Sequence, residues 1–312
     1  MKIVFAGTPE FALAPLRAIV EAGFDVVGVI TQEDKPQGRK GVLTPPPVKT
    51  LALSLGLPVF QPAKIRDFIA EIAALGADVM VTCAYGQILT QAVLDCFPKG
   101  VWNIHAGLLP KYRGASPIQS CILAGETETG VSIMKTELGL DCGDVLFVER
   151  TPISPTETYG ELSARLSLLS APLIIKALNA LKLGNFTLTE QGKEGVQIVR
   201  KIGKEHAKID FTRSAQEIVN LVRASNPAPV AFTRTEQGIL NVYLAEIAPW
   251  QEEYASAVAG EIVCDLPKKG LIVRCGDGAV KLLEVQAAGG KRMKGSDFLN
   301  GKKVVKGQVF LC

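Results

Sequence analysis

Short apolar runs alternate with longer amphipathic stretches along the first two-thirds of the chain. The apolar runs are rich in β-branched residues, which predicts strands buried on both faces: Ile3–Ala6, Val26–Thr31, Val79–Ala84 and Val101–His105. The stretches between them have helical spacing: Phe11–Ala22, Val48–Leu55, Lys64–Leu75 and Ser116–Ala124. This alternation predicts an α/β domain with a Rossmann-like, doubly wound parallel sheet. In such a sheet, ligands bind beyond the carboxyl ends of the strands.

The chain continues with a strand pair, Gly130–Lys135 and Asp144–Ile153, and then with a long helix. The stretch Thr158-Tyr-Gly-Glu161 has the spacing of a capping box and predicts the start of this helix, which runs to about residue 182. No apolar run reaches the roughly 18 residues that a membrane span needs. The richest candidate, Leu166–Leu183, is interrupted by Lys176.

The last third has a different pattern. Gln191–Glu205 is polar and aperiodic, which is typical of a linker. A helix follows, opened by the capping-box pattern Ser214-Ala-Gln-Glu217. Short strands with Gly-rich turns come after it: Leu240–Ile247, Gly260–Asp265, Leu271–Arg274, Val280–Val285 and Gln308–Leu311. One helix with several short strands predicts a small β-barrel. We therefore expect an α/β domain over residues 1–189, a linker over 190–206 and a barrel domain over 207–312.

Composition narrows the class of protein. The chain has 312 residues, seven cysteines without CxxC spacing and two histidines. This argues against a zinc site and against a disulfide framework, and we predict no metal. The opening MKIVFAGTPEF enters a strand at once, unlike a secretory signal. We expect a soluble, cytoplasmic monomer with reduced cysteines and no membrane partner.

Gly7 follows the first strand in a turn where a helix N-terminus can bind a nucleotide phosphate. The dinucleotide fingerprint, however, needs further glycines for the turn and for close approach. Pro9 suits the first turn of a helix, where its missing N–H costs nothing. Glu33 and Asp34 follow the second strand and can hold a ribose. Without the glycines, we favour a plain helix N-terminus over a nicotinamide site.

The segment from Val101 to Gly114 carries the clearest candidate chemistry. Asn103 and His105 alternate with period two, so both side chains can project to one side at the end of a buried strand. Further on, Asp141 and Asp144 lie in a loop before a strand. An amide, an imidazole and a carboxylate suit acyl transfer, since they can bind an oxyanion, move a proton and orient the imidazole. Alternatively, these side chains cap turns.

These motifs resemble the folate-dependent formyltransferase family. The resemblance rests on Asn103-Ile-His105, on the stretch Leu108-Leu-Pro-Lys-Tyr-Arg-Gly-Ala-Ser-Pro-Ile-Gln119 and on Leu140-Asp-Cys-Gly-Asp144. It implies the formyltransferase fold, 10-formyltetrahydrofolate as co-substrate, no metal, and catalytic roles for Asn103, His105 and Asp141. It further implies a folate-binding site formed by Gly107, Leu108, Leu109, Pro110 and Gly86.

The implied reaction is a direct attack of an amine on the formyl carbon. Asn103 and a protonated His105 would stabilise the oxyanion. Asp141 would hold His105 charged and help to move a proton towards the departing N10. A carboxylate within about 4–6 Å favours the charged imidazole, so we expect a raised pKa for His105. In the family a serine usually precedes Leu108, and here Gly107 replaces it; Cys142 likewise replaces a threonine.

The resemblance extends over the whole chain to the branch of the family that formylates the methionine of initiator methionyl-tRNA. This wider resemblance rests on four parts of the chain: PheAlaGlyThrPro near the start, the loop Thr31–Lys40 followed by Pro45–Lys49, Lys208–Thr212 and Arg223–Pro227. It implies an OB-like, tRNA-binding C-terminal domain, and a role in translation initiation.

The distribution of charge agrees with a tRNA partner. Residues 1–200 have 18 Lys and Arg against 19 Asp and Glu, and residues 201–312 have 16 against 12, so the halves carry −1 and +4. Between Lys268 and Lys306, ten basic residues face three acidic ones. A basic barrel suits the phosphate backbone, although a solvated lysine-rich surface has the same pattern. We assign tRNA binding to Lys291, Arg292 and Lys294 in the barrel. The resemblance implies that the Gln32–Lys49 loop binds the end of the acceptor stem through Lys35, Arg39 and Lys40, although a plain surface loop is the alternative.

Other functions remain open from the residues. A formyltransferase acting on a small amine, such as glycinamide ribonucleotide or an amino-sugar nucleotide, would use the same three catalytic side chains. It would give no purpose to the basic barrel or to the Gln32–Lys49 loop. A nicotinamide oxidoreductase lacks the glycines, and a non-catalytic RNA-binding protein would not need Asn103, His105 and Asp141.

Overall fold

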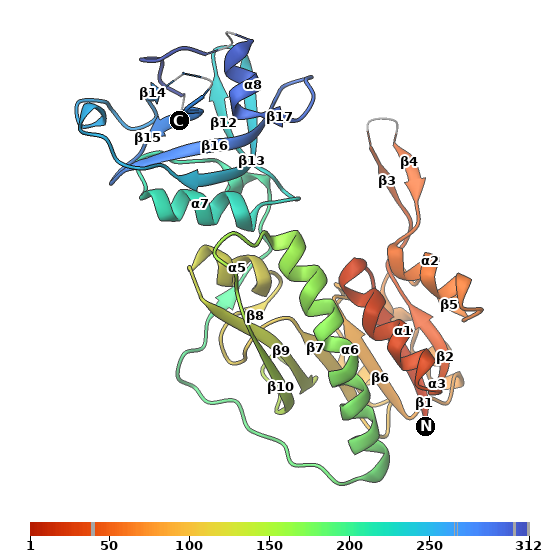
Figure 1. Ribbon diagram of the computed structural model, residues 1–312. Coiled ribbons are helices and arrows are strands. Elements are labelled where there is room, and N and C mark those ends of the chain that lie inside the picture. Colours follow the sequence, from red (N-terminus) through yellow and green to blue (C-terminus); the bar gives the residue numbers. More distant parts are fainter. Residues whose placement is uncertain (39–40, 265, 267, 302–303, 311–312) are drawn as a thin grey trace. The chain divides into compact units, whose positions relative to one another are not determined.

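The computed structural model describes residues 1–38, 41–264, 266, 268–301 and 304–310 (Figure 1). The chain forms two compact units. The first comprises Met1–Pro117, Glu128–Pro152 and Ser163–Arg200, and the second comprises Ile118–Thr127, Ile153–Leu162 and Lys201–Cys312. The chain therefore passes between the units at several places, and the passage after Arg200 falls within the stretch expected to be a linker.

A seven-stranded sheet forms the centre of the first unit, with strand order β10-β9-β7-β6-β1-β2-β5. Its strands are β1 (Lys2–Gly7), β2 (Asp25–Ile30), β5 (Val59–Phe60), β6 (Val79–Cys83), β7 (Val101–His105), β9 (Glu128–Lys135) and β10 (Val145–Pro152). From β5 to β7 neighbouring strands are parallel, whereas β9 and β10 continue the sheet as antiparallel strands. The predicted parallel strands and the predicted strand pair are thus confirmed.

The strand order reverses between β1 and β6, because β2 and β5 lead from β1 to one edge and β7 leads from β6 towards the other. At this point Thr8 Oγ1 donates a hydrogen bond to Tyr85 O over 3.0 Å. A Cβ on Gly7 would lie 2.9 Å from Cys83 O, so the close approach of β1 and β6 requires glycine there. In open α/β sheets such a reversal forms the crevice in which ligands bind.

Short helices connect the strands of the first unit: α1 (Leu13–Glu21) after the 3-10 turn Glu10–Ala12, α2 (Pro47–Ser54), α3 (Ile69–Ala74) after the 3-10 turn Ile65–Asp67, and α4 (Gln91–Leu94). The prediction of one helix over Lys64–Leu75 is wrong, because Phe68 leaves the helical region with φ −118° and ψ 25°. Its ring packs 5.5 Å from the ring of Phe60, a tertiary contact that the local sequence does not encode.

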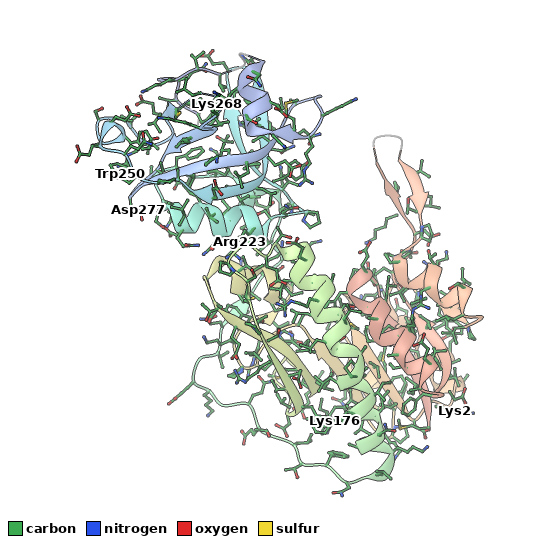
Figure 2. The ribbon with its side chains drawn as sticks, in the orientation of Figure 1. Lys2, Lys176, Arg223, Trp250, Lys268 and Asp277 are labelled. Carbon is green, nitrogen blue, oxygen red and sulfur yellow. The ribbon has the colours of Figure 1, made fainter. Side chains whose placement is uncertain are left out.

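The long helix α6 (Tyr159–Leu183) begins with the predicted capping box. Thr158 N donates to Glu161 Oε2 over 2.9 Å, and Glu161 N donates to Thr158 Oγ1 over 3.4 Å. By length and composition α6 is apolar enough to cross a membrane. From Ser163 onwards, however, it packs in the first unit, with a buried bond from Ser167 Oγ to Phe11 O and with Lys176 Nζ 4.3 Å from the ring centre of Phe147. Lys176 is labelled in Figure 2. We therefore regard α6 as a core helix.

The Gln32–Lys49 loop contains a β-hairpin formed by β3 (Lys35–Gln37) and β4 (Val42–Thr44). Its base is closed by Lys49 Nζ, which donates to both oxygens of Asp34 over 2.9 and 2.8 Å. Gln61 Nε2 donates to the same carboxylate over 2.8 Å, and together these bonds hold the pKa of Asp34 below its usual value. The two ends of the insertion are thereby tied to each other and to the sheet.

Residues 190–206, expected to form an aperiodic linker, contain the short strand β11 (Ile198–Val199) and the start of a 3-10 turn, Lys204–Ala207. β11 pairs in parallel with β8 (Arg113–Gly114), which follows the end of β7. Gly114 has φ +119°, and a Cβ on it would lie 2.3 Å from Val199 O. Because main-chain pairing with a distant segment forms this strand, side-chain periodicity did not indicate it.

The second unit is built on a curled, six-stranded antiparallel sheet in which β12-β13-β16-β15-β14 are neighbours and β17 pairs with β16. Its strands are β12 (Ala231–Thr235), β13 (Gly238–Ile247), β14 (Ile262–Cys264), β15 (Leu271–Arg274), β16 (Ala279–Ala287) and β17 (Met293–Lys294). The second unit also contains the helices α5 (Pro117–Leu123), α7 (Ala215–Ala224) and α8 (Gly295–Asn300), and a 3-10 turn, Glu252–Tyr254. Pro117, the first residue of α5, still belongs to the first unit. Apolar side chains of α7 and α8 join those of the strands in one core.

The prediction of a single helix beside these strands is wrong, because α8 also packs there through Phe298 and Leu299. The predicted strand over Gln308–Leu311 is wrong for the residues that the structure describes, where Val309 forms an isolated bridge with Glu261. The predicted start of α7 is confirmed, since Ser214 N donates to Glu217 Oε2 over 3.0 Å and Glu217 N donates to Ser214 Oγ over 3.2 Å.

The capping box of α7 gives a prediction for stability. Ser214→Ala removes one acceptor from the N-terminus of a helix whose apolar face lies in the core, and we expect a loss of about 1 kcal/mol in the free energy of unfolding. Chemical denaturation followed by circular dichroism measures it. Ser256→Ala, at an exposed serine outside any helix or strand, is the control. Equal stability of the two variants would contradict the prediction.

Candidate active site at the carboxyl end of the sheet

Asn103 and His105 lie at the carboxyl end of β7, and both contact Asp141. Asn103 Nδ2 lies 3.5 Å from Asp141 Oδ1, and His105 Nδ1 lies 3.6 Å from Asp141 Oδ2. The hydroxyl of Thr82, on the neighbouring strand β6, donates to Asn103 Oδ1 over 3.0 Å, which directs the amide nitrogen towards Asp141. The structure thus brings the amide, imidazole and carboxylate together.

Asp141 lies in the loop between β9 and β10, with a positive φ of 46°. Gly114 N donates to Asp141 Oδ2 over 2.8 Å, so one carboxylate contacts the amide, the ring and the main chain after β7. The side chain of Asp141 is 20% exposed, whereas that of His105 is 3% exposed. Asp141 is therefore the member of the pair that solvent, or a substrate, can reach.

His105 is enclosed by hydrogen-bond acceptors. Its Nε2 lies 3.1 Å from Tyr112 O, and its Nδ1 faces Asp141. Burial nevertheless lowers the pKa of His105, because it removes water from the imidazolium, while Asp141 and the Tyr112 carbonyl offset this only in part. The expected raised pKa is therefore wrong, and the resting ring is neutral near neutral pH.

The residues after His105 form a tight turn held by Ser132 on β9. Ser132 Oγ donates to Gly107 O over 2.7 Å and accepts from Leu109 N over 3.4 Å. A Cβ on Gly107 would lie 3.2 Å from His105 Nε2, so glycine leaves space beside the ring. Leu108 packs close to Gly130, and Leu109 and Pro110 are half-buried. Sequence reasoning missed Ser132 and Gly114, whose role is visible only through cross-strand contacts.

Gly86 follows β6 at the same edge of the sheet, with φ +85°. Gln32 Nε2 donates to Tyr85 O over 3.2 Å, and a Cβ on Gly86 would lie 3.1 Å from the same nitrogen. Gly86 is exposed, so its main chain is accessible to a ligand on the side away from Gln32. The folate candidates Gly86 and Gly107 thus follow two neighbouring parallel strands, β6 and β7.

Four of the six tRNA candidates lie in the part of the chain that the structure describes. Lys35 is exposed on β3, and its Nζ donates to Gln32 Oε1 over 3.0 Å. Arg39 and Lys40 lie outside the residues that the structure describes. In the second unit, Lys291 and Lys294 are exposed, whereas Arg292 binds both carboxylate oxygens of Glu284 and stacks 4.1 Å from the ring centre of Tyr243. Arg292 is therefore partly neutralised.

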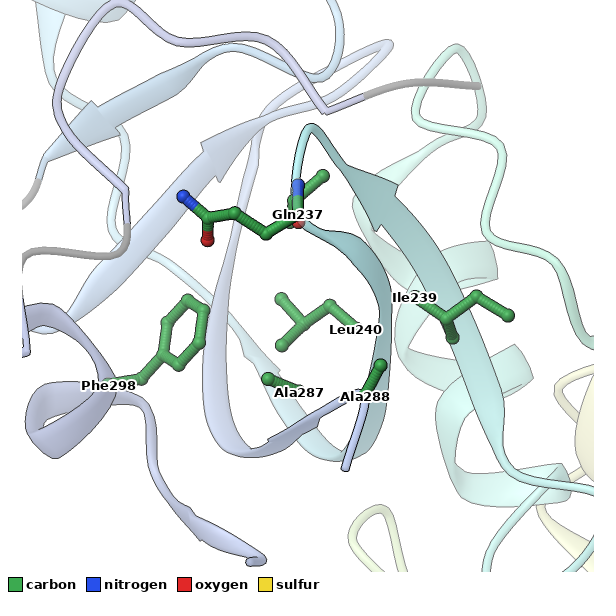
Figure 3. Close-up of a pocket in the computed structure, with 7 residues that line it drawn as sticks. Gln237, Ile239, Leu240, Ala287, Ala288 and Phe298 are labelled. Carbon is green, nitrogen blue, oxygen red and sulfur yellow. The ribbon is translucent and has the colours of Figure 1, made fainter. Parts of the chain in front are cut away.

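Two hollows in the described surface are lined by residues other than the three catalytic candidates. One of about 350 Å³ in the second unit is lined by the β12–β13 turn, the end of β16 and Phe298 (Figure 3). A larger one, of about 1040 Å³, lies in the first unit beside Gly100, Val101 and Trp102, where β7 begins. His105 lies at the other end of that strand.

Comparison with known proteins identifies the chemistry. Residues 1–178 match the formyl transferase family, and residues 201–303 match the family described as formyl transferase, C-terminal domain. The methionyl-tRNA formyltransferase of Symbiobacterium thermophilum is 44% identical over 312 residues, which cover 99% of this chain and 95% of that protein. The one of Chromohalobacter salexigens is 46% identical over 307 residues, covering 97% and 94%. The chain belongs to the methionyl-tRNA formyltransferase family.

Solved structures extend this formyltransferase assignment to the fold. HypX from Aquifex aeolicus in complex with tetrahydrofolic acid has a TM-score of 0.66 and 17% identity, covering 99% of this chain and 48% of that one. An N-formyltransferase from Helicobacter canadensis, in complex with folinic acid and dTDP-3-aminofucose, has a TM-score of 0.66 and 17% identity, covering 90% and 98%. The predicted formyltransferase fold, an α/β domain followed by a β domain, is confirmed.

The pairing of His105 with Asp141 predicts how the ring of this formyltransferase titrates. Because the Asp141 carboxylate raises the pKa of His105 against the larger effect of burial, Asp141→Asn should lower that pKa further. Histidine-selective NMR measures this directly, with His206 as the second signal in each spectrum. The pKa of His105 is lower in the folded protein than in the unfolded chain, where a histidine titrates at about 6.5. The folded protein therefore loses stability as the pH falls through about 6.5. A rise in the pKa of His105 in Asp141→Asn would contradict the assigned pairing.

Proposed function

We propose that the chain transfers the formyl group of 10-formyltetrahydrofolate to the α-amino group of methionine on initiator methionyl-tRNA, in the cytoplasm, for translation initiation. The observation that carries this proposal is the contact of Asn103 and His105 with one carboxylate, Asp141, at the carboxyl end of β7. Such a group of side chains can stabilise an oxyanion and hold a proton without forming a covalent intermediate. The full-length likeness to methionyl-tRNA formyltransferases supports this choice of substrates.

Asn103 is the residue that we assign to oxyanion stabilisation. Its Oδ1 accepts from Thr82, so its Nδ2 carries the available N–H groups, and one of these faces Asp141. The other can donate to the formyl oxygen as the amine attacks and negative charge develops there. A preorganised donor of this kind is worth a rate factor of about 10²–10³.

His105 and Asp141 are the pair that we assign to proton transfer. The attacking amino group must lose a proton, and N10 of the folate must gain one as its bond to the formyl carbon breaks. Because the resting ring is neutral, the pair can accept the first proton, and the imidazolium would be stabilised by Asp141 and by Tyr112 O. The same pair can then return that proton towards N10. This revises the expectation of a histidine that is charged from the start.

The residues around the three catalytic candidates fit a folate. Gly86 exposes main chain beside β6, Gly107 is buried beside the His105 ring, and the half-buried Leu108, Leu109 and Pro110 supply apolar surface for a pterin. When bound, 10-formyltetrahydrofolate supplies the reactive formyl carbon. Gly107 also leaves room at His105 Nε2, so the main chain rather than a hydroxyl would contact the ligand at this position.

For tRNA we assign the β3–β4 hairpin, with Lys35, Arg39 and Lys40, and the basic segment with Lys291, Arg292 and Lys294. The hairpin emerges next to Gln32, whose side chain reaches Tyr85 beside Gly86. An acceptor end bound by this hairpin would therefore approach the folate candidates. The exposed lysines of the second unit suit contacts to the phosphate backbone, which carry affinity without base recognition.

The proposed reaction is tested by incubating the chain with 10-formyltetrahydrofolate and charged initiator tRNA, and by detecting formylmethionine by mass spectrometry. Asn103→Ala and His105→Ala should each lower turnover by roughly 10²–10³-fold, because each removes stabilisation of the transition state. Binding of tRNA to both variants should stay nearly unchanged. Formylation of a small amine without formation of formylmethionine would contradict the proposed function.

The assignment of phosphate contacts predicts a change in salt dependence. Replacing both Lys291 and Lys294 by alanine should make the slope of log K against log salt shallower by about 1 for each lysine. Filter binding of initiator tRNA between low and physiological salt measures it. Lys64→Ala, at an exposed lysine of the first unit, is the control. Equal slopes for the wild type and the double variant would show that Lys291 and Lys294 do not contact tRNA phosphates.

A further inference from the structure

The segment from Thr189 to Val199 lies along the elements that carry the site. Val145 and Thr189 exchange main-chain hydrogen bonds of 2.9 and 2.8 Å, next to the loop of Asp141. Eight and ten residues further on, Arg113 N donates to Gln197 O over 2.8 Å, and Ala115 N donates to Val199 O over 3.0 Å. These last bonds flank Gly114, whose N–H binds the carboxylate of Asp141. The segment therefore supports both sides of the Asp141 contact.

Between these anchors, the side chain of Gln191 spans the gap to the Asp141 loop. Its Nε2 donates to Asp141 O over 2.9 Å and to Gly143 O over 2.7 Å. Its Oε1 accepts from Arg113 Nε over 3.0 Å, which fixes which end of the amide faces the loop. One half-buried side chain thus binds the main chain of the catalytic candidate and the residue before Gly114.

The conformation of Asp141 needs such support. Its φ of 46° lies in the left-handed region, which aspartate enters more readily than most residues but which remains uncommon outside glycine. The same loop contains Gly139 at φ +125°, and the side chains of Leu138 and Leu140 are exposed, so the tip of the loop contributes little packing. Hydrogen bonds from other segments must then hold the carboxylate where His105 and Asn103 meet it.

We propose that Gln191 is a positioning residue for catalysis, which holds the Asp141 loop so that one carboxylate faces both His105 and Asn103. The proposal rests on the proposed function of these three side chains. Gln191 acts through the main chain of Asp141, and it needs no contact with substrate. Loss of its two donors would let the carboxylate move away from the ring, and a displacement of about 1 Å at a reacting group lowers rates up to about 10²-fold.

Gln191→Met tests this in the full-length chain, because methionine keeps the length and neutrality of glutamine but donates no hydrogen bond. Turnover with saturating folate and charged tRNA should fall roughly tenfold, while KM for both substrates stays within about twofold. In the same variant, the pKa of His105 measured by NMR should fall, because the carboxylate that raises it has moved.

Gln119→Met is the matched control. Gln119 also donates through Nε2 to two main-chain carbonyls, those of Ala224 and Ala228, over 3.2 and 3.3 Å, but within the second unit. It should leave turnover and the titration of His105 unchanged, even if the melting temperature falls. Should Gln191→Met fail to fold, Gln191→Glu keeps the acceptor for Arg113 without the donors, and a tenfold loss of turnover in that variant supports the same role.

A purely structural role would lower the melting temperature of Gln191→Met and leave turnover and the pKa of His105 in place, and this result would overturn the proposal. Loss of turnover without a shift of the His105 signal would overturn it as well. The NMR measurement uses no substrate. If the wild type formylates no methionyl-tRNA while the pKa of His105 still responds to Gln191, the proposed function fails and the coupling of Gln191 to Asp141 stands.

Discussion

The geometry of the site depends on the carboxylate of Asp141, which lies within hydrogen-bonding reach of the Asn103 amide, the His105 ring and the main chain at Gly114. Two of these partners lie on β7 and the third on β8, so the arrangement exists only when the sheet, the β9–β10 loop and β8 are all in place. A carboxylate with several donors is also restrained in direction, which is what preorganisation at a reacting centre requires. The fold thus supplies one fixed negative charge at the edge of a buried strand.

Because His105 is buried, the charge of Asp141 strongly affects the protonation of its ring. In water a single carboxylate at 3.6 Å would hold the ring protonated, but enclosure of the ring removes the solvent that stabilises an imidazolium. The ring therefore rests neutral beside an anion and a carbonyl, both of which become favourable partners once it gains a proton. A ring with a lowered pKa is a weaker base than free imidazole, so it takes up a proton only when a reacting group delivers one directly, and it releases that proton readily afterwards.

Much of this arrangement could be predicted from the sequence, because the signals were local. Continuous apolar runs identified β1, β2, β6 and β7, and the alternation of Asn103 with His105 placed both at one strand end. The expected charge of His105 was wrong, since the sequence shows a possible partner but not the burial of the ring. The structure of the segment around Gln191 was not predicted either, because long-range hydrogen bonds hold this polar, aperiodic stretch in place and leave no pattern in the sequence.

The ion pair at the base of the β3–β4 hairpin has an evolutionary consequence. Lys49 and Gln61 both bind Asp34, so the ends of the insertion are joined at the sheet whatever lies between them. Length and composition of the tip can then change by mutation without altering the strands or the side chains at their carboxyl ends. A hairpin built in this way is an exchangeable module, and the acceptor recognition that we propose for it could then be adjusted by selection independently of the reaction itself.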